Sequence, residues 1–141
     1  MKARLALLSL ALGLGFSGTL HADANALQAR LSCQKAAGPG RVLCELTTKS
    51  SSDKLVWSDA LVVRAPGFAR PLRSRFVAQV GAGSEPGAAW AKLALVASGP
   101  GQGQLELLAR GVVCPEPGAG EPCKAVALPV SALIEVGQVP P

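Results

Sequence analysis

The sequence contains no tyrosine, one methionine and one histidine. The methionine is Met1 and the histidine is His21, so both lie near the N-terminal end. A chain that loses this end has no histidine for a Ser-His-Asp triad, a Cys-His pair or a histidine metal site. It also lacks the thioether that binds copper. These absences exclude the histidine-dependent sites just named, and we expect neither a metal site nor a cofactor.

The N-terminal end has the order of segments found in a secretory signal peptide. Two basic residues precede an uncharged apolar run, 5–16, and small residues lead to Ala22. This order predicts removal of residues 1–22, with cleavage after Ala24 as a close alternative. Residues 23–141 then form the mature chain, whose length fits one domain. We therefore expect an exported protein of the periplasm or the extracellular space.

Charged residues are also scarce, at 16% of the chain, and the formal net charge is +5. Two of the basic residues belong to the predicted signal peptide, so the mature chain is only mildly basic. Such a charge gives no indication of nucleic-acid binding, and we expect no nucleic-acid partner. After Ala22 no apolar run approaches the roughly 18 residues that cross a bilayer. We therefore expect no transmembrane segment in the mature chain.

Glycine and proline are plentiful, at 16 and 11 residues, and they separate short apolar runs, as turns separate strands. The runs with alternating or strand-like character cover 27–33, 41–48, 55–63, 72–80, 88–97, 104–114 and 124–136. Period-two alternation is typical of half-buried strands. Their number and spacing predict an all-β fold, a single antiparallel immunoglobulin-like β-sandwich of about seven strands. Pro129 should divide the last run into two pieces of an edge strand.

Parity along these runs predicts which side chains fill the core. The larger ones expected to face inward are Trp57, Leu72, Phe76, Val80 and Trp90. Exposed tryptophans could instead stack on sugar rings, but both lie in apolar runs, which favours the core. Asp59 breaks the apolar parity around Trp57 and indicates a β-bulge or an edge strand.

The even number of cysteines predicts two disulfides in an exported protein. The four are Cys33, Cys44, Cys114 and Cys123. The first pair flanks a turn at 37–40 and the second a turn at 118–120, so hairpin closure places each pair face to face. We therefore predict Cys33–Cys44 and Cys114–Cys123. A bond between the hairpins, such as Cys33–Cys114, would resemble an inter-sheet immunoglobulin bridge and is the alternative. The spacing is unlike that of zinc ligands.

The segment Leu105–Val136 resembles the end of a periplasmic immunoglobulin-like domain, the N-terminal domain of the membrane thiol:disulfide interchange reductases. In that family a strand leads into a cysteine, a short loop reaches a second cysteine, and an apolar strand with proline follows. The counterparts here are Cys114, Cys123 and the run 128–130. The resemblance implies a thiol–disulfide relay that passes electrons to periplasmic partners. The structural alternative is a second disulfide that only stabilises the fold.

Positive charge gathers between the middle strands, at Arg64, Arg70, Arg73 and Arg75. We place Arg73 and Arg75 on one strand face, where they could bind an anionic polysaccharide, a lipid headgroup or an acidic partner. Otherwise the arginines form a solvated face that discourages edge pairing. The sequence thus predicts an exported protein without a catalytic centre, with a binding or structural role in the cell envelope. The relay through Cys114 and Cys123 is the alternative function, and binding of a carbohydrate or an anion by the arginines is a third.

Overall fold

The computed structural model describes residues 26–139, so the predicted signal peptide lies outside the described residues. The strands are β1 (Leu27–Cys33), β2 (Gly40–Ser50), β3 (Lys54–Arg64), β4 (Ala69–Pro71), β5 (Arg75–Val80), β6 (Ala89–Ala97), β7 (Gly101–Cys114) and β8 (Lys124–Val136). The all-β prediction is confirmed, with eight strands where about seven were expected; the short β4 was not anticipated. Within 26–139, no helix is long and apolar enough to pass through a bilayer.

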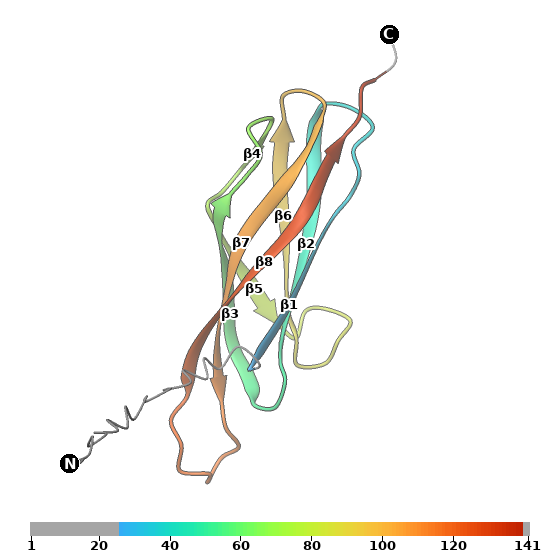
Figure 1. Ribbon diagram of the computed structural model, residues 1–141. Helices are drawn as coiled ribbons and strands as arrows, with labels where there is room; N and C mark the ends of the chain where they lie inside the picture. Colours follow the sequence, from blue (N-terminus) through green and yellow to red (C-terminus); the bar gives the residue numbers. More distant parts are fainter. Residues whose placement is uncertain (1–25, 140–141) are drawn as a thin grey trace, which may run out of the picture.

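One antiparallel sheet holds all eight strands, in the order β1-β2-β6-β5-β3-β7-β8, and β4 pairs with β6. The sheet is continuous because β5 pairs with β3 near its start and with β6 at its end, through Gln79 and Val80. In Figure 1, β7 and β8 cross over β2 and β6, so the two halves of the sheet face each other. The immunoglobulin-like form of this fold stays a prediction.

The two ends of the sheet meet just beyond β1 and at the end of β8. The N–H of Ala36 donates to the carbonyl of Glu135 at 3.0 Å, and the N–H of Gly137 donates to the carbonyl of Ala36 at 2.9 Å. A Cβ at Gly137 would lie 2.8 Å from the carbonyl oxygen of Ala37, so only glycine allows this close approach. Ala36 also forms a parallel bridge with Val136. The sheet therefore curls around its core.

The core fills the space between the two halves, and both halves contribute leucines and other aliphatic side chains to one cluster. Its largest fully buried apolar members are Leu46, Leu93, Leu95, Leu105, Leu107 and Ile134. Each occupies the inward parity of a strand, as the alternating pattern requires. The opposite parity of β1, β2 and β6 is thereby directed to the outside, where the candidate binding site lies.

Two irregularities in β3 reverse the inward parity that the sequence suggested. The β3–β7 register shifts between Leu55 and Trp57, and again between Val62 and Arg64. An extra residue in one strand turns the following side chains to the other face. Leu55 and Ala60 are therefore buried, whereas Trp57 is 36% exposed. The prediction that Trp57 fills the core was wrong, and the bulge indicated by the broken parity is present.

Three smaller predictions also need correction. The strand expected from residue 72 begins only at Arg75, and Leu72 before it is 59% exposed. Phe76 is buried as predicted, but Val80 at the end of β5 is exposed. β8 runs through Pro129 as one strand rather than two. It is an edge strand, as expected, and an edge strand needs only alternate N–H groups for its single ladder.

Candidate functional site

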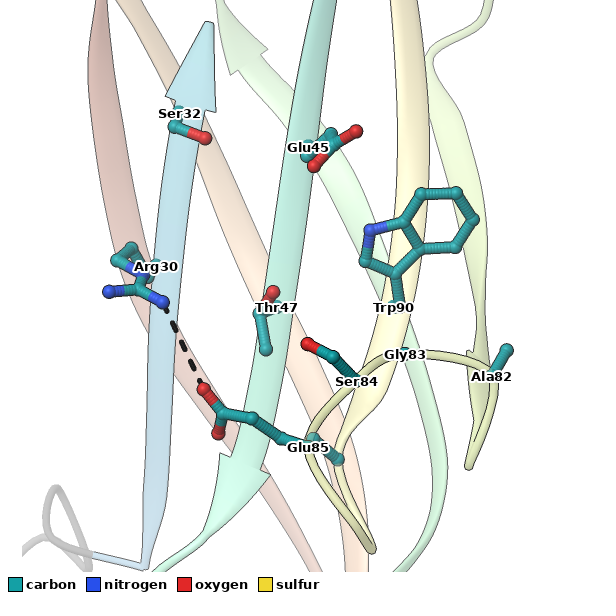
Figure 2. Close-up of a pocket in the computed structure, with 10 residues that line it drawn as sticks. Arg30, Ser32, Glu45, Thr47, Ala82, Gly83, Ser84, Glu85 and Trp90 are labelled. Atoms are coloured by element: carbon teal, nitrogen blue, oxygen red, sulfur yellow. Dashed lines mark ion pairs between the residues drawn. The ribbon is translucent and has the colours of Figure 1, made fainter.

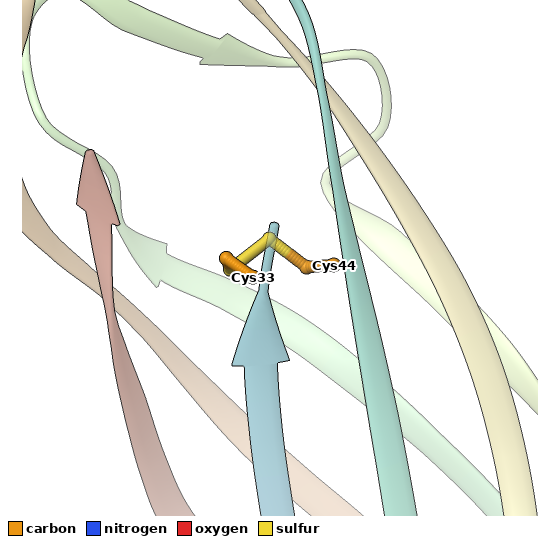
Figure 3. The surroundings of a disulfide bond; sticks show 2 residues. All are labelled: Cys33 and Cys44. Atoms are coloured by element: carbon orange, nitrogen blue, oxygen red, sulfur yellow. A yellow bond between two sulfur atoms is a disulfide. The ribbon is translucent and has the colours of Figure 1, made fainter. Parts of the chain in front are cut away.

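Both predicted disulfides are present, and the described residues contain no free cysteine. Cys33 and Cys44 stand opposite each other in the β1–β2 register, with an S–S distance of 2.03 Å (Figure 3). Cys44 is fully buried and Cys33 packs against the core. Cys114 and Cys123 are bonded at an S–S distance of 2.14 Å. The predicted pairing within each hairpin is therefore confirmed, and the alternative bond between the two hairpins is not formed.

The two disulfides differ in how a partner could reach them. Cys44 is 0% exposed, so a thiolate from another protein has no access to its sulfur in the folded chain. Cys123 is exposed, and it lies at the end of the loop that joins β7 to β8. Thiol–disulfide exchange requires attack on an accessible sulfur. Of the two bonds, the one between Cys114 and Cys123 has the more accessible sulfur for such an exchange.

The arginines singled out in the sequence do not form one free cationic patch. They are Arg64 at the end of β3, Arg70 in β4, Arg73 between β4 and β5, and Arg75 at the start of β5. The Nε of Arg64 lies 3.8 Å from the Oε2 of Glu106, and the Nε of Arg75 lies 2.7 Å from the Oδ2 of Asp59. Arg73 is outside the strand that contains Arg75, so the predicted shared face was wrong. For Arg70 and Arg73, residues 26–139 offer no carboxylate within ion-pair distance.

Asp59 is the buried centre of a cluster that the sequence did not reveal. Its side chain is 0% exposed and accepts hydrogen bonds from the Nε of Arg75 at 2.7 Å and the Nε of Arg110 at 2.8 Å. Both guanidinium groups lie about the ring of Trp57, at 6.0 and 5.8 Å from its centroid. Burial by itself would raise the pKa of Asp59, but the hydrogen bonds and charges of the two arginines outweigh it and lower that pKa. The cluster joins β5, β3 and β7.

A hollow of about 620 Å³ lies on the outer face of β1, β2 and β6, partly enclosed by the loop that joins β5 to β6. We call it the Trp90 hollow (Figure 2). Its lining residues are Arg30, Ser32, Glu45, Thr47, Ala82, Gly83, Ser84, Glu85, Ala88 and Trp90. One aromatic ring thus stands among hydroxyl, carboxylate and guanidinium groups. Its volume falls within the range typical of small-molecule sites, about 300–1,000 Å³.

Strand pairing explains how these side chains come together. Arg30 of β1 pairs with Thr47 of β2, and Thr47 pairs in turn with Trp90 of β6. Two residues further along β1, Ser32 pairs with Glu45 of β2. Directly opposed side chains on one sheet face have Cβ atoms about 4.5–5.5 Å apart. The three strands therefore present two neighbouring rows of polar and aromatic groups to the same side.

Ion pairs connect the β5–β6 loop, which forms one side of the hollow, to β1 and β2. Glu85 lies 3.9 Å from the Nη2 of Arg30 and 3.4 Å from the Nζ of Lys49. The base of the loop is closed by the N–H of Gly81, which donates to the carbonyl of Ala88 at 2.8 Å. Glu45, by contrast, makes no ion pair with any residue that the structure describes. Lys92 stands opposite it in the β2–β6 register but beyond ion-pair distance, so the carboxylate of Glu45 is open to a ligand.

A second hollow of about 240 Å³ adjoins the first along β1 and β2. The two share Arg30, Thr47 and Glu85, and the second adds Gln28 and Lys49 among its lining residues. Because Arg30 and Glu85 belong to both, their ion pair marks the boundary. The combined groove follows the outer face of the hairpin formed by β1 and β2.

The Trp90 hollow was missed at the level of the sequence, although one signal pointed to it. Trp90 has the same parity in its run as Lys92, opposite to that of the buried Leu93 and Leu95. That parity directs Trp90 outward, and the residue is indeed only partly buried, so its predicted place in the core was wrong. The ammonium of Lys92 now lies 5.8 Å from the centroid of the Trp90 ring. The pairing of β2 with β6 is long-range and has no local sequence signal.

The described residues contain no group of three or more metal-ligating side chains with metal-site geometry. Comparison with protein-family models, with curated proteins and with solved structures finds no match. Function must therefore be inferred from the residues and their surroundings.

Proposed function

We propose that this chain is an exported binding protein of the cell envelope that acts without a catalytic centre and holds its ligand in the Trp90 hollow. The observation that supports it is the hollow itself, in which the Trp90 ring is surrounded by Arg30, Glu45 and the hydroxyls of Ser32 and Thr47. A concave site with an aromatic surface and a few convergent polar groups is the usual form of a ligand site.

Export is supported by the disulfides and by the predicted signal peptide together. Disulfides such as Cys33–Cys44 form and persist in oxidising compartments and are rare in the cytosol. A periplasmic or extracellular location follows from the same reasoning, and an immunoglobulin-like sandwich would suit such a setting. Binding rather than catalysis is supported by the chemistry of the lining residues. A serine or threonine nucleophile needs an adjacent base, and residues 26–139 contain no histidine, the side chain that most often serves as one.

A thiol–disulfide relay is the second candidate function, and the exposure of Cys123 favours it. In that function a partner thiolate attacks the Cys114–Cys123 bond and forms a mixed disulfide, while the electron pair of the broken bond leaves on the other sulfur as a thiolate. The function needs no ligand in the Trp90 hollow, so the two candidates can be separated by variants.

Co-sedimentation with envelope fragments from the exporting cells tests the proposal. We expect the mature chain to sediment with the fragments, and expect Trp90→Ala and Arg30→Ala each to reduce the bound fraction at least several-fold. Arg73→Ala is the matched control, because Arg73 is exposed, outside the hollow and part of the alternative anion-binding cluster. Circular dichroism of each variant reports whether it has folded.

Three results would contradict the proposal. If a folded Trp90→Ala variant still sediments fully with the fragments, the hollow takes no part in the interaction. Loss of binding in Arg73→Ala alone would favour the anion-binding alternative. Loss of binding only when Cys114 and Cys123 are both replaced by serine would favour the relay.

A further inference from the structure

We infer that the ligand of the Trp90 hollow is a carbohydrate, a neutral oligosaccharide with one ring stacked on the indole of Trp90. This inference rests on the proposed function, because it names the ligand class for the same site. It is supported by the placement of the ring, by the hydrogen-bonding groups around it, by the balance of charge and by the length of the groove.

The ring of Trp90 is placed as a platform. Figure 2 shows the indole nearly face-on when the outer side of the sheet faces the viewer, with its nitrogen turned toward the strand that carries Glu45 and Thr47. The loop approaches the base of the same side chain, since a Cβ at Gly83 would lie 3.3 Å from the Cβ of Trp90. A flat ring face along a sheet offers the broad apolar contact that the C–H face of a pyranose needs.

The present contact of Lys92 shows what this ring face attracts. The ammonium of Lys92 lies 5.8 Å from the centroid of the Trp90 ring, in a cation–π arrangement. The attraction comes from the negative face of the aromatic quadrupole. The C–H hydrogens of a sugar carry partial positive charge and are attracted in the same way. Lys92 is exposed, and a lysine side chain has a flexible four-carbon stem, so its ammonium can leave the ring and donate to a sugar hydroxyl from the side.

The groups around the ring match the hydrogen-bonding needs of sugar hydroxyls. Each such hydroxyl both donates and accepts. The carboxylate of Glu45 accepts, the guanidinium of Arg30 donates, and the hydroxyls of Ser32, Thr47 and Ser84 do both. Glu45 is the group best placed to accept from a ligand, because it forms no ion pair among the described residues, although Lys92 stands opposite it in the β2–β6 register. A ligand rich in hydroxyls uses all of these groups.

The charges of the site give no strong attraction to a charged ligand. Glu85 is paired with Arg30 and Lys49, and Glu45 stands opposite Lys92 in the β2–β6 register, so positive and negative groups lie close together. An ion of either sign would meet a like charge beside each opposite one, and this lowers its affinity. A neutral saccharide meets no such repulsion. The inferred ligand is therefore unlike the anionic polysaccharide that the arginine cluster suggested.

The groove continues past the first ring. The second hollow, of about 240 Å³, begins at the Arg30–Glu85 ion pair and runs along β1 and β2. A sugar ring stacked on Trp90 would therefore have a neighbouring compartment for the next ring of a chain. We expect a trisaccharide to bind more tightly than a monosaccharide of the same type.

Tryptophan fluorescence provides the test, in a Trp57→Phe background that leaves Trp90 as the only tryptophan of the mature chain. The probes are cellotriose, maltotriose and triacetylchitotriose, with deacetylated chitotriose and trigalacturonate as the charged counterparts. We expect at least one neutral trisaccharide to change the Trp90 emission and to bind about tenfold or more tightly than the charged trimers. Calorimetry on Trp90→Ala, which keeps Trp57, should show that this binding is lost.

The inference is overturned if no neutral trisaccharide binds at about 10 mM, if a charged trimer binds more tightly, or if folded Trp90→Ala binds as well as the unaltered chain. Competition in the co-sedimentation assay separates this failure from failure of the proposed function, with each neutral trisaccharide added at about 10 mM. Retention that requires Trp90 but is not reduced by any neutral trisaccharide would leave the proposed function standing and the carbohydrate inference refuted. We expect at least one neutral trisaccharide to displace the chain from the fragments.

Discussion

Asp59 of β3 and Arg110 of β7 stand directly opposite each other in the sheet, and the guanidinium donates to both carboxylate oxygens of Asp59. The acid is fully buried and the arginine is only partly so. A carboxylate in such a place is stable only when it is paired, because an unpaired buried charge is costly. Arg75 completes the pairing from the other side, and Trp57 contacts both cations.

We expect Asp59→Asn to lower the free energy of unfolding at pH 7 by about 1–3 kcal/mol, because charge-assisted hydrogen bonds are lost. The pKa of Asp59 is lowered in the folded chain: burial would raise it, but Arg110 and Arg75 more than compensate. A lowered folded-state pKa means that this stabilisation is complete above the unfolded value of about 4 and disappears as the pH falls through the lower, folded value.

Urea titration at several pH values checks this prediction. The difference between the unaltered chain and Asp59→Asn should be largest at neutral pH and should shrink as the solution becomes strongly acidic. Asp53→Asn is the control, because Asp53 makes no ion pair in the part of the chain that the structure describes. A difference that is constant from pH 7 down to strongly acidic solution would contradict the paired state of Asp59.

The two aromatic residues near the centre of the sheet should differ in their effect on stability. Phe76 is 9% exposed and packs in the core, so we expect Phe76→Ala to cost about 3–5 kcal/mol. Trp57 lies on the outer face, so Trp57→Ala should cost clearly less. Denaturant unfolding of both variants decides the order, and a larger loss for Trp57→Ala would show that the bulge near residue 56 is misplaced.

The disulfides should be reduced in a fixed order. Cys44 is buried and Cys123 is exposed, so increasing dithiothreitol should open Cys114–Cys123 first. Removing Cys33–Cys44 should then destabilise the chain by about 2–3 kcal/mol, as closure of a short loop implies. Alkylation followed by mass spectrometry gives the order, and early labelling of Cys33 would refute it.

The same titration gives the reduction potential of the Cys114–Cys123 bond, and this value tests the relay function. A structural bond has a reduction potential below about −300 mV, whereas relay proteins equilibrate at about −120 to −270 mV. We expect Cys114–Cys123 to behave as a structural bond. A potential in the relay range would support thiol–disulfide exchange as the function.

Export predicts the N-terminal residue of the mature chain. Mass spectrometry of the protein recovered from the periplasm or medium should find a chain that begins at Asp23 or Asn25. Recovery of a chain that begins at Met1, confined to the cytoplasm, would contradict both export and the oxidising compartment that the disulfides require.

The sequence predicted most of the fold where alternation was unbroken. Strands β1 and β2 and their disulfide followed from period-two parity about one turn, because both depend on residues close in sequence. In β3 the register shift between Leu55 and Trp57 reverses the parity, and this is why the prediction that Trp57 fills the core was wrong. A bulge is stabilised by the neighbouring strand, so its position is not encoded locally.

The candidate site depended on long-range pairing in the same way. The outward parity of Arg30 and Thr47 was readable from their own strands. Their meeting with Trp90 required the β2–β6 pairing, which joins residues more than 40 positions apart. The burial of Asp59 likewise needed Arg110 from a distant strand. Single-strand patterns indicate which face a side chain occupies, but not which side chains share that face.

The most direct test of the Trp90 hollow is a titration of the ¹⁵N-labelled mature chain with solubilised envelope extract, followed by amide and indole chemical shifts. We expect the Trp90 indole signal to shift, together with the amides of Arg30, Thr47 and residues 82–85, while the signals around Trp57 stay fixed. Shifts confined to the Cys114–Cys123 loop or to the arginines of β4 and β5, with an unchanged Trp90 indole, would contradict it.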